Sequence, residues 1–228
     1  MLLVIANKLY SSWSLRPWML MRELAIPFDE EVIPLRRPDT RARILARSGA
    51  GKCPVLIDGD VTVWESLAIA EYLADKFPDK CVWPADAKAR AHARAASNEM
   101  HAGFQPLRAA CPMNLAKRFA PRDFGPDVAV SVARLEDLWR DARARFGSRA
   151  HGPFLYGAFT AADAMFAPVV TRLDTYQIAV AADTRAYMDA VLGTPSFLAW
   201  KAGALAEPRE WDIGEYEDGH TSVEAFKR

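Results

Sequence analysis

The first 80 residues alternate short apolar runs with longer stretches in which apolar residues recur every three or four positions. The short runs predict β-strands at Leu2–Ala6, Phe28–Ile33, Pro54–Ile57 and Val61–Val63. The periodic stretches predict helices over Ser14–Ala25, Arg41–Arg47 and Ser66–Phe77. Asp58-Gly59 lies between the last two strands and favours a tight hairpin. The order βαβ–α–ββα predicts a small mixed sheet with helices on its faces.

The pattern changes after Pro78-Asp79-Lys80, and we place a linker at residues 78–86. Beyond it we expect no further strands, so residues 1–80 form an α/β domain and residues 81–228 an all-helical one. The predicted helices are Ala85–Ala110, Phe124–Phe146, Thr160–Gln177, Thr184–Leu192 and Pro195–Ala206. Gly147–Gly157 is expected to be a loop. Residues Trp211–Arg228 are polar and predict a tail that packs on the outside or is partly disordered.

Composition excludes several classes of protein. The chain has 228 residues, of which 51% are hydrophobic, and its 29 basic and 29 acidic residues cancel. It has no basic block typical of nucleic-acid binding and no apolar run long enough to span a bilayer. Three widely spaced cysteines and the absence of a signal-peptide pattern favour the cytoplasm. The four histidines have no metal-ligand spacing, so we expect no metal.

The junction between the first strand and the first helix is rich in hydroxyl groups. It reads Tyr10-Ser11-Ser12-Trp13-Ser14-Leu15-Arg16-Pro17. Pro17 suits a first helical turn, and Ser14 or Ser12 is the expected N-cap. A helix N-terminus attracts anions, so the junction predicts an anion site beside a hydroxyl. The alternative is that the serines only cap the helix and complete the turn.

Two further pieces of the first half fall at the same end of the predicted sheet. Cys53-Pro54 opens a strand, where a proline marks an edge, a strand start or a cis bond. Glu65-Ser66 opens a helix, and Ser66 is a second candidate N-cap with its own anion site. Each piece alone is more often structural than functional. Their order and spacing together suggest a binding site.

These pieces resemble those of a known family. The serine junction, the loop Gly51-Lys52-Cys53-Pro54-Val55-Leu56 and the segment Trp64–Leu73 are similar to the thioredoxin-like domain of cytosolic glutathione transferases. In the second half, Phe104-Gln105-Pro106-Leu107 resembles the fourth helix of the zeta class, and Phe159–Asp163 resembles the capping box of the sixth. The resemblance covers nearly the whole chain. It is closest to bacterial serine-type enzymes of zeta or tau character.

The resemblance implies a role for each matching residue. Ser11, with Ser12 beside it, would donate a hydrogen bond to the sulfur of glutathione, the expected co-substrate. Lys52 would lie near its glycine end, and the backbone of Cys53, ahead of a cis Pro54, would pair with its cysteinyl unit. Glu65 and Ser66 would hold the γ-glutamyl amine and carboxylate. The resemblance also implies a homodimer and a small hydrophobic electrophile as second substrate.

The chain also departs from the zeta pattern. Trp13 replaces the cysteine of the zeta motif and either lines the electrophile pocket or packs under the turn. The arginine of zeta isomerases aligns with Thr175, whereas Arg172 lies one turn earlier. We therefore do not assign maleylacetoacetate isomerisation. Met100, His101 and Arg172 are further candidates for the electrophile pocket, although His101 is equally well explained as an interhelical residue.

Three smaller expectations concern structure and competing functions. Thr160 and Asp163 have the spacing of an N-cap and its N3 partner, which predicts a structural role. Trp64 faces either a partner subunit or the core. The leading interpretation is a glutathione transferase. The alternatives are a non-catalytic module of the same fold that binds ligands or proteins, and a glutathione-dependent isomerase. A thiol-disulfide oxidoreductase is disfavoured because the first helix lacks a cysteine at its start.

Overall fold

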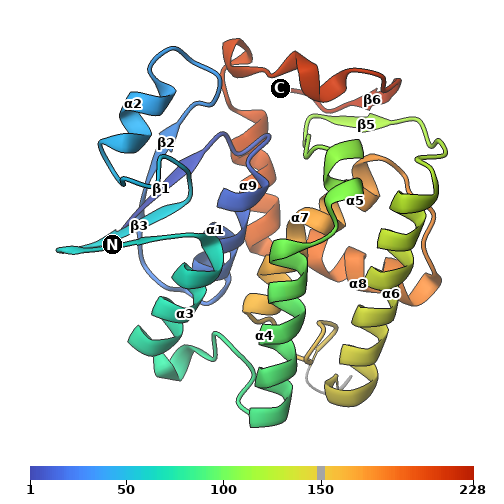
Figure 1. Cartoon of the computed structure of the whole chain (residues 1–228), viewed down its shortest axis with the longest axis horizontal. Helices are drawn as coiled ribbons and strands as arrows, with labels where there is room; N and C mark the ends of the chain where they lie inside the picture. The colour runs from blue at the N-terminus through green and yellow to red at the C-terminus, as the bar shows by residue number, and fades with distance from the viewer. Residues whose placement is uncertain (148–151) are drawn as a thin grey trace.

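A four-stranded mixed sheet forms the N-terminal part of the protein. The computed structural model describes residues 1–147 and 152–228, so part of the predicted loop Gly147–Gly157 lies outside the described residues. The strands β1 to β4 lie in the order β2-β1-β3-β4, with β1 parallel to β2 and antiparallel to β3. Figure 1 labels β1, β2 and β3 of this sheet. Their bounds are β1 Leu2–Ala6, β2 Asp29–Ile33, β3 Val55–Asp58 and β4 Val61–Trp64.

Three helices cover the two faces of this sheet: α1 (Ser12–Glu23), α2 (Thr40–Leu45) and α3 (Ser66–Lys76). Side chains alternate along each strand, as the pleat requires. Leu3 and Ile5 of β1 pack in the main core with α1 and α3, whereas Val4 packs with Ile44 of α2 on the other face. The predicted order βαβ–α–ββα and the thioredoxin-like arrangement are confirmed.

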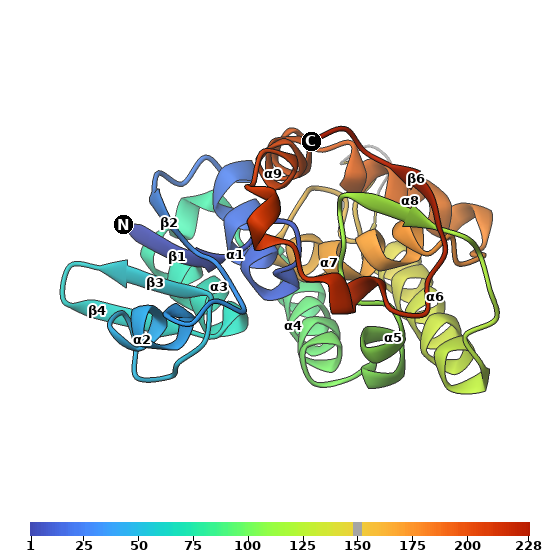
Figure 2. The same cartoon turned by 90° about the horizontal axis from the view of Figure 1, so that it is seen from above.

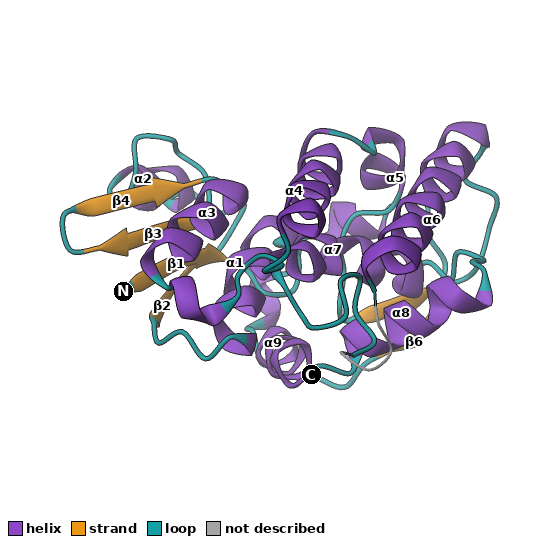
Figure 3. Cartoon of the chain, turned by 90° about the horizontal axis from the view of Figure 1, so that it is seen from below, coloured by secondary structure: helices purple, strands orange, loops and turns teal. Residues whose placement is uncertain are grey.

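The second part of the chain is mainly helical and lies beside the sheet (Figure 3). Its helices are α4 (Ala87–Ala102), α5 (Gln105–Ala110), α6 (Pro126–Phe146), α7 (Ala161–Thr175), α8 (Ala182–Leu192) and α9 (Pro195–Leu205). Helix α7 is the centre of this part, because every residue in it except Asp174 is buried. None of the helices in the described ranges combines the length and apolar character that a bilayer-spanning segment needs.

The predicted single helix Ala85–Ala110 is wrong. The structure breaks it into α4 and α5 at Gly103 and Phe104, and Phe104 adopts a left-handed conformation with φ of 60°. Pro106 explains the break. Its ring would clash with the carbonyl of Ala102 in a continuous helix, and it has no N–H to donate there. Helix α5 then packs against α6.

The expectation of no strands after residue 80 is also wrong. Residues Lys117–Phe119 (β5) pair in antiparallel fashion with Ser222–Ala225 (β6) near the C-terminus. Between α9 and β6 the chain forms two short 3-10 helices, Arg209–Trp211 and Gly214–Glu217. Figure 2 shows this red segment crossing from α9 to β6. We call residues 207–228 the C-terminal strap. The tail was predicted either to pack on the outside or to be partly disordered, and in the structure it packs.

The start of α7 is held by a buried carboxylate, as its spacing predicted. Asp163 accepts hydrogen bonds from the backbone N–H groups of Thr160 (2.9 Å) and Leu155 (3.1 Å). The hydroxyls of Thr160 and Tyr187 donate to it as well, both at 3.2 Å. With Thr160 as the N-cap, this is a capping box that also ties in α8.

Loss of this carboxylate should destabilise the fold. We expect Asp163→Ala to lower the free energy of unfolding by about 3 kcal/mol, because it leaves buried donors unsatisfied and removes half of the capping box. Chemical denaturation followed by circular dichroism measures the change. Asp137→Ala is the matched control, since the Asp137 side chain is 70% exposed and should contribute about 0.5 kcal/mol or less. Equal effects of the two substitutions would contradict a structural role for Asp163.

Candidate functional site

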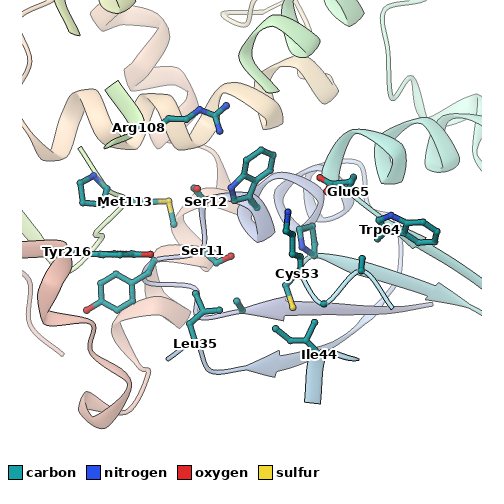
Figure 4. Close-up of a pocket in the computed structure, with 18 of the residues that line it drawn as sticks. Ser11, Ser12, Leu35, Ile44, Cys53, Trp64, Glu65, Arg108, Met113 and Tyr216 are labelled. Atoms are coloured by element: carbon teal, nitrogen blue, oxygen red, sulfur yellow. The ribbon is translucent and has the colours of Figure 1, made fainter. Parts of the chain in front are cut away.

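A cleft of about 900 Å³ lies between the sheet and the helical part. One wall comes from the β1–α1 turn, the loop before β3 and the end of β4; the other comes from α4, α5, α7 and the C-terminal strap. Figure 4 shows Ser11, Ser12, Cys53 and Glu65 around this opening, with Arg108 and Met113 on the side away from Cys53. The three sequence pieces that were expected to converge therefore do so.

The N-terminus of α1 presents two hydroxyls to the cleft. Ser11 is the N-cap, since its Oγ accepts from the Ser14 N–H at 3.3 Å and lies 2.8 Å from the Ser14 Oγ. The buried Ser14 hydroxyl accepts in turn from the Ala6 N–H at 3.1 Å, which ties the helix to β1. Ser12 follows as the first helical residue, and both Ser11 and Ser12 line the cleft.

The predicted N-cap at Ser14 or Ser12 is therefore wrong, and so is the placement of Pro17 in the first turn. Pro17 lies inside α1, because the helix begins at Ser12. Serine is a good N-cap wherever its oxygen reaches the N–H three residues later, and Ser11 meets that condition first. Proline is often found in the first turn of a helix, but here the N-cap hydrogen bond of Ser11 starts the helix before Pro17.

The loop before β3 supplies the second piece of the site. Lys52, Cys53 and Pro54 line the cleft, and the Cys53–Pro54 peptide bond is cis. Burial raises the pKa of the Cys53 thiol to about 11. The thiol is thus protonated at neutral pH and is not a nucleophile there.

The third piece differs from its prediction in one respect. Glu65, not Ser66, occupies the N-cap position of α3, with a left-handed φ of 69° that directs it to the cleft lining. Ser66 is fully buried, and its hydroxyl accepts from Arg16 at 3.2 Å. The Ser66 side chain therefore does not cap the helix, and Ser66 is not among the residues that line the cleft.

Arg16 is the most unusual charge near the site. Its guanidinium is 1% exposed and has no carboxylate within salt-bridge distance among the described residues. It donates to Ser66 and to the Met100 sulfur, while its Nε has no partner. Burial, together with the positive charges of Arg108 and Arg172, lowers its pKa well below the usual value. A buried cation without a counter-ion costs free energy, which suggests that an anion belongs nearby.

Trp13 packs against two guanidinium groups. Arg16 lies 4.1 Å from its ring centroid and Arg108 lies 5.1 Å from it. His101 meets the same ring edge-on at 5.0 Å and also lies 3.9 Å from Glu65. Trp13 and His101 both line the cleft. For each of them, this is one of the two positions that the sequence predicted. Met100 does not: it is fully buried, and its sulfur is covered by Arg16 and Arg108, so its predicted place in the pocket is corrected.

Two more guanidinium groups, those of Arg108 and Arg172, line the far wall. Arg172 donates to the carbonyls of Cys111 (2.9 Å) and Pro168 (3.1 Å), and Arg108 donates to the carbonyls of Met100 and His101. Neither forms a salt bridge with a carboxylate in the described part of the chain. Burial and the charge of Arg108 lower the pKa of Arg172 to about 10. The sequence analysis missed Arg108, because its place depends on the break before α5.

The C-terminal strap supplies the last part of the wall, which the sequence analysis also missed. Glu215 and Tyr216 line the cleft, and the Tyr216 ring packs edge-on against Tyr10 at 5.4 Å. Glu217 anchors the strap, since the Asn114 amide donates to it and Lys117 pairs with it. The pairing of β5 with β6 and these side-chain contacts bring the strap to the site, and no local sequence pattern indicates them.

Together these groups can bind an elongated anion and hold a negative atom beside α1. Ser11 and Ser12 offer hydroxyl donors at a positive helix end, while Lys52, Arg108 and Arg172 add positive charge. Residues 1–147 and 152–228 contain no group of three His, Cys, Asp or Glu side chains that would hold a metal ion. The Cys53 thiol, whose pKa burial raises to about 11, is not set up as a nucleophile in this cleft.

Comparisons with known proteins agree with this geometry. Residues 10–76 match the family model described as "Glutathione S-transferase, N-terminal domain". A dichloromethane dehalogenase of Methylorubrum extorquens is 38% identical over 65 residues, which cover 28% of this chain and 23% of the relative. A probable maleylacetoacetate isomerase of Caenorhabditis elegans is 36% identical over 104 residues, which cover 43% of this chain and 48% of the relative. The matched segments thus span less than half of these relatives.

Solved structures extend the likeness to nearly the whole chain. A glutathione transferase homologue from Burkholderia, solved with bound glutathione, superposes with a TM-score of 0.66 at 22% identity. The match covers 90% of this chain and 98% of that structure. At this identity the likeness establishes the fold, which is that of the glutathione transferases.

The unpaired Arg16 leads to a prediction about stability. We expect Arg16→Met to change the free energy of unfolding by about 1 kcal/mol or less, or to raise it, because methionine fills the space without a buried charge. Arg16→Ala should lower it by about 2–3 kcal/mol, since it leaves a cavity beside Trp13. Denaturant titration of both variants measures this difference. A large loss of stability in Arg16→Met would show that the charge itself supports the fold.

Proposed function

Because the chain belongs to the cytosolic glutathione S-transferase superfamily, we propose that it is a glutathione transferase of serine type. In this proposal it transfers the glutathione thiolate to a small hydrophobic electrophile. Residues 1–80 bind the tripeptide, and residues 81–228 provide most of the pocket for the electrophile. The observation that carries the proposal is the pair of hydroxyls, Ser11 and Ser12, at the N-terminus of α1 inside the cleft.

Hydrogen bonding and the helix end together are sufficient to ionise the thiol. A free thiol titrates near pH 8.5, and each unit of lowering requires about 1.4 kcal/mol. A hydrogen bond to a charged group supplies roughly 1.5–3 kcal/mol, and a helix N-terminus supplies roughly 0.3–1 kcal/mol. Their sum lowers the thiol pKa by about two units. The Ser11 proton can turn to the sulfur, because the Ser14 hydroxyl can then donate to Ser11 at the observed 2.8 Å.

The other residues of the near wall hold the rest of the tripeptide in this proposal. Lys52 pairs with the glycine carboxylate, and the backbone of Cys53, before the cis Pro54, bonds to the cysteinyl unit. Glu65 receives the γ-glutamyl amine. The γ-glutamyl carboxylate lies at the N-terminus of α3, where it takes the Ser66 N–H and the charge of the buried Arg16. We also propose a homodimer, for which the half-exposed Trp64 is available on the sheet edge.

A second candidate is a glutathione-dependent isomerase that acts on an unsaturated carboxylic acid. Two cleft-lining guanidiniums without carboxylate partners in the described residues, Arg108 and Arg172, favour an acidic substrate. The similarity to a probable maleylacetoacetate isomerase points the same way. Thr175, which aligns with the arginine of zeta isomerases, bonds to the Asn114 carbonyl instead of facing the cleft. An isomerase reaction would therefore use a different set of cations here.

The direct test of the proposal is calorimetric titration with reduced glutathione and with an S-alkyl glutathione. We expect both to bind in the micromolar to millimolar range, with the S-alkyl form tighter if its alkyl group enters the far side of the cleft. If neither ligand produces heat or a thermal shift, the enzyme proposal fails. The chain would then be a module of this fold that binds other ligands or proteins.

The two serines can be separated by combining turnover with stability. We expect Ser11→Ala to reduce kcat/KM for an activated aryl halide by roughly ten- to hundredfold, since it removes one hydrogen bond to a charged sulfur. It should also lower the free energy of unfolding by about 1 kcal/mol, because Ser11 is the N-cap. Ser12→Ala is the matched variant, and it should not affect stability. If only Ser12→Ala lost activity, Ser12 would be the thiolate donor.

The role of Arg108 can be tested with paired electrophiles. We expect Arg108→Met to raise the KM about tenfold for an unsaturated carboxylic acid, because a charge-assisted hydrogen bond is lost. The KM for the methyl ester of the same acid should stay unchanged. Steady-state kinetics with both substrates measures this difference. An equal change for acid and ester would indicate that Arg108 only supports Trp13.

A further inference from the structure

The turn that carries the cleft serines is held from the far end of the chain. The N–H of Lys8 donates to Glu207 Oε1 at 2.5 Å, and the N–H of Leu9 donates to Glu207 Oε2 at 3.2 Å. Glu207 lies 199 residues after Lys8, just beyond α9. One carboxylate thus satisfies two consecutive backbone donors, one of which belongs to the fully buried Leu9.

Helix α9 supports this contact along one face. The Trp200 indole N–H donates to the Lys8 carbonyl at 2.9 Å, and at Gly203 a β-carbon would come within 3.0 Å of the Lys8 side chain. Trp200 and Gly203 are three residues apart in α9, so they face the same side, and Glu207 follows just beyond the end of the helix. The end of α9 is therefore fitted to the backbone of residues 8 and 9.

The same turn fixes the position of Ser11. The Asn7 carbonyl accepts from the N–H of Tyr10 at 3.2 Å and from the N–H of Ser11 at 2.8 Å. Residues 7–11 are therefore one hydrogen-bonded unit, which Glu207 holds at its middle. A displacement of Lys8 and Leu9 would move the Ser11 hydroxyl relative to the cleft.

We propose that Glu207 is a positioning residue for the thiolate site. It does not line the cleft, but it sets the place of the serine hydroxyl through the backbone of Lys8 and Leu9. This inference rests on the proposed function, because it concerns the thiolate that Ser11 would stabilise. It assigns to the end of the helical part a direct effect on the chemistry of the N-terminal part.

Glutamine is the informative substitution at this position. It has nearly the shape of glutamate, but its amide carries one acceptor oxygen and an NH₂ group, which would face a backbone N–H. The positive groups around Glu207 keep other partners, since Lys8 pairs with Glu30 and Arg228 pairs with Asp212. Glu207→Gln should therefore release one end of the turn without leaving those cations unpaired.

The experiment measures the apparent pKa of glutathione bound to the full-length protein, from the ultraviolet absorbance of the thiolate as a function of pH. We expect Glu207→Gln to raise this pKa by about half a unit to one unit, a roughly three- to tenfold loss of thiolate at intermediate pH. The kcat should fall in the same proportion, while the affinity for an S-alkyl glutathione stays unchanged. Glu210→Gln is the control, because its side chain takes no part in holding the turn.

The outcomes separate this inference from the proposed function. If the wild-type protein does not lower the thiol pKa, the serine mechanism fails, and the role of Glu207 fails with it. If the wild type lowers the pKa and Glu207→Gln does so equally, only the positioning role is overturned, whatever happens to stability. Should Glu207→Gln not fold, Trp200→Phe removes the hydrogen bond to the Lys8 carbonyl and should shift the thiol pKa in the same direction.

Discussion

The hydrogen bonds that join the start of α1 to the end of β1 are the constraint on which the site depends. Ser14 is fully buried and binds the Ala6 N–H, while Ser11 binds the Ser14 N–H. The last residue of the strand and the first turn of the helix therefore cannot move independently. This arrangement keeps the positive end of α1 and two hydroxyls at the cleft. The sheet, α7 and the end of α9 all pack so as to hold this junction in place.

The guanidinium groups at the cleft lower the stability of the folded state and favour the binding of an anion. Burial lowers the pKa values of Arg16, Arg108 and Arg172, and the charge of Arg108 lowers those of Arg16 and Arg172 further. No carboxylate among the described residues pairs with them at salt-bridge distance. Trp13 offsets part of this cost, because two of the guanidiniums pack against its ring. Burial of apolar residues elsewhere in the core can compensate for this unfavourable free energy. Helix α7, for example, is buried along almost its whole length. An anionic ligand in the cleft would supply the negative charge that these guanidiniums lack among the described residues.

Much of the near wall could be predicted from sequence, and little of the far wall. Strand and helix periods fix the order βαβ–α–ββα, and that order alone brings Ser11, Cys53 and Glu65 to one end of the sheet. Short-range preferences failed where two of them competed, as when Ser11 capped the helix ahead of Pro17. Arg108 and the strap depend on a break at Phe104 and on strand pairing across about a hundred residues, for which one sequence carries no local signal.

This difference has a physical consequence for how the protein can change. The near wall is set by contacts within a few residues, so a substitution there disturbs capping or backbone conformation directly. The far wall consists of side chains on α5, α7 and the strap whose backbones are already satisfied by other contacts. An exposed side chain on this wall, such as Glu215, can therefore vary in charge and size at small cost to folding. Arg172 cannot, because it is buried and donates to two backbone carbonyls. Glu207 is an exception, because it belongs to the second half of the chain by sequence and to the near wall by its hydrogen bonds.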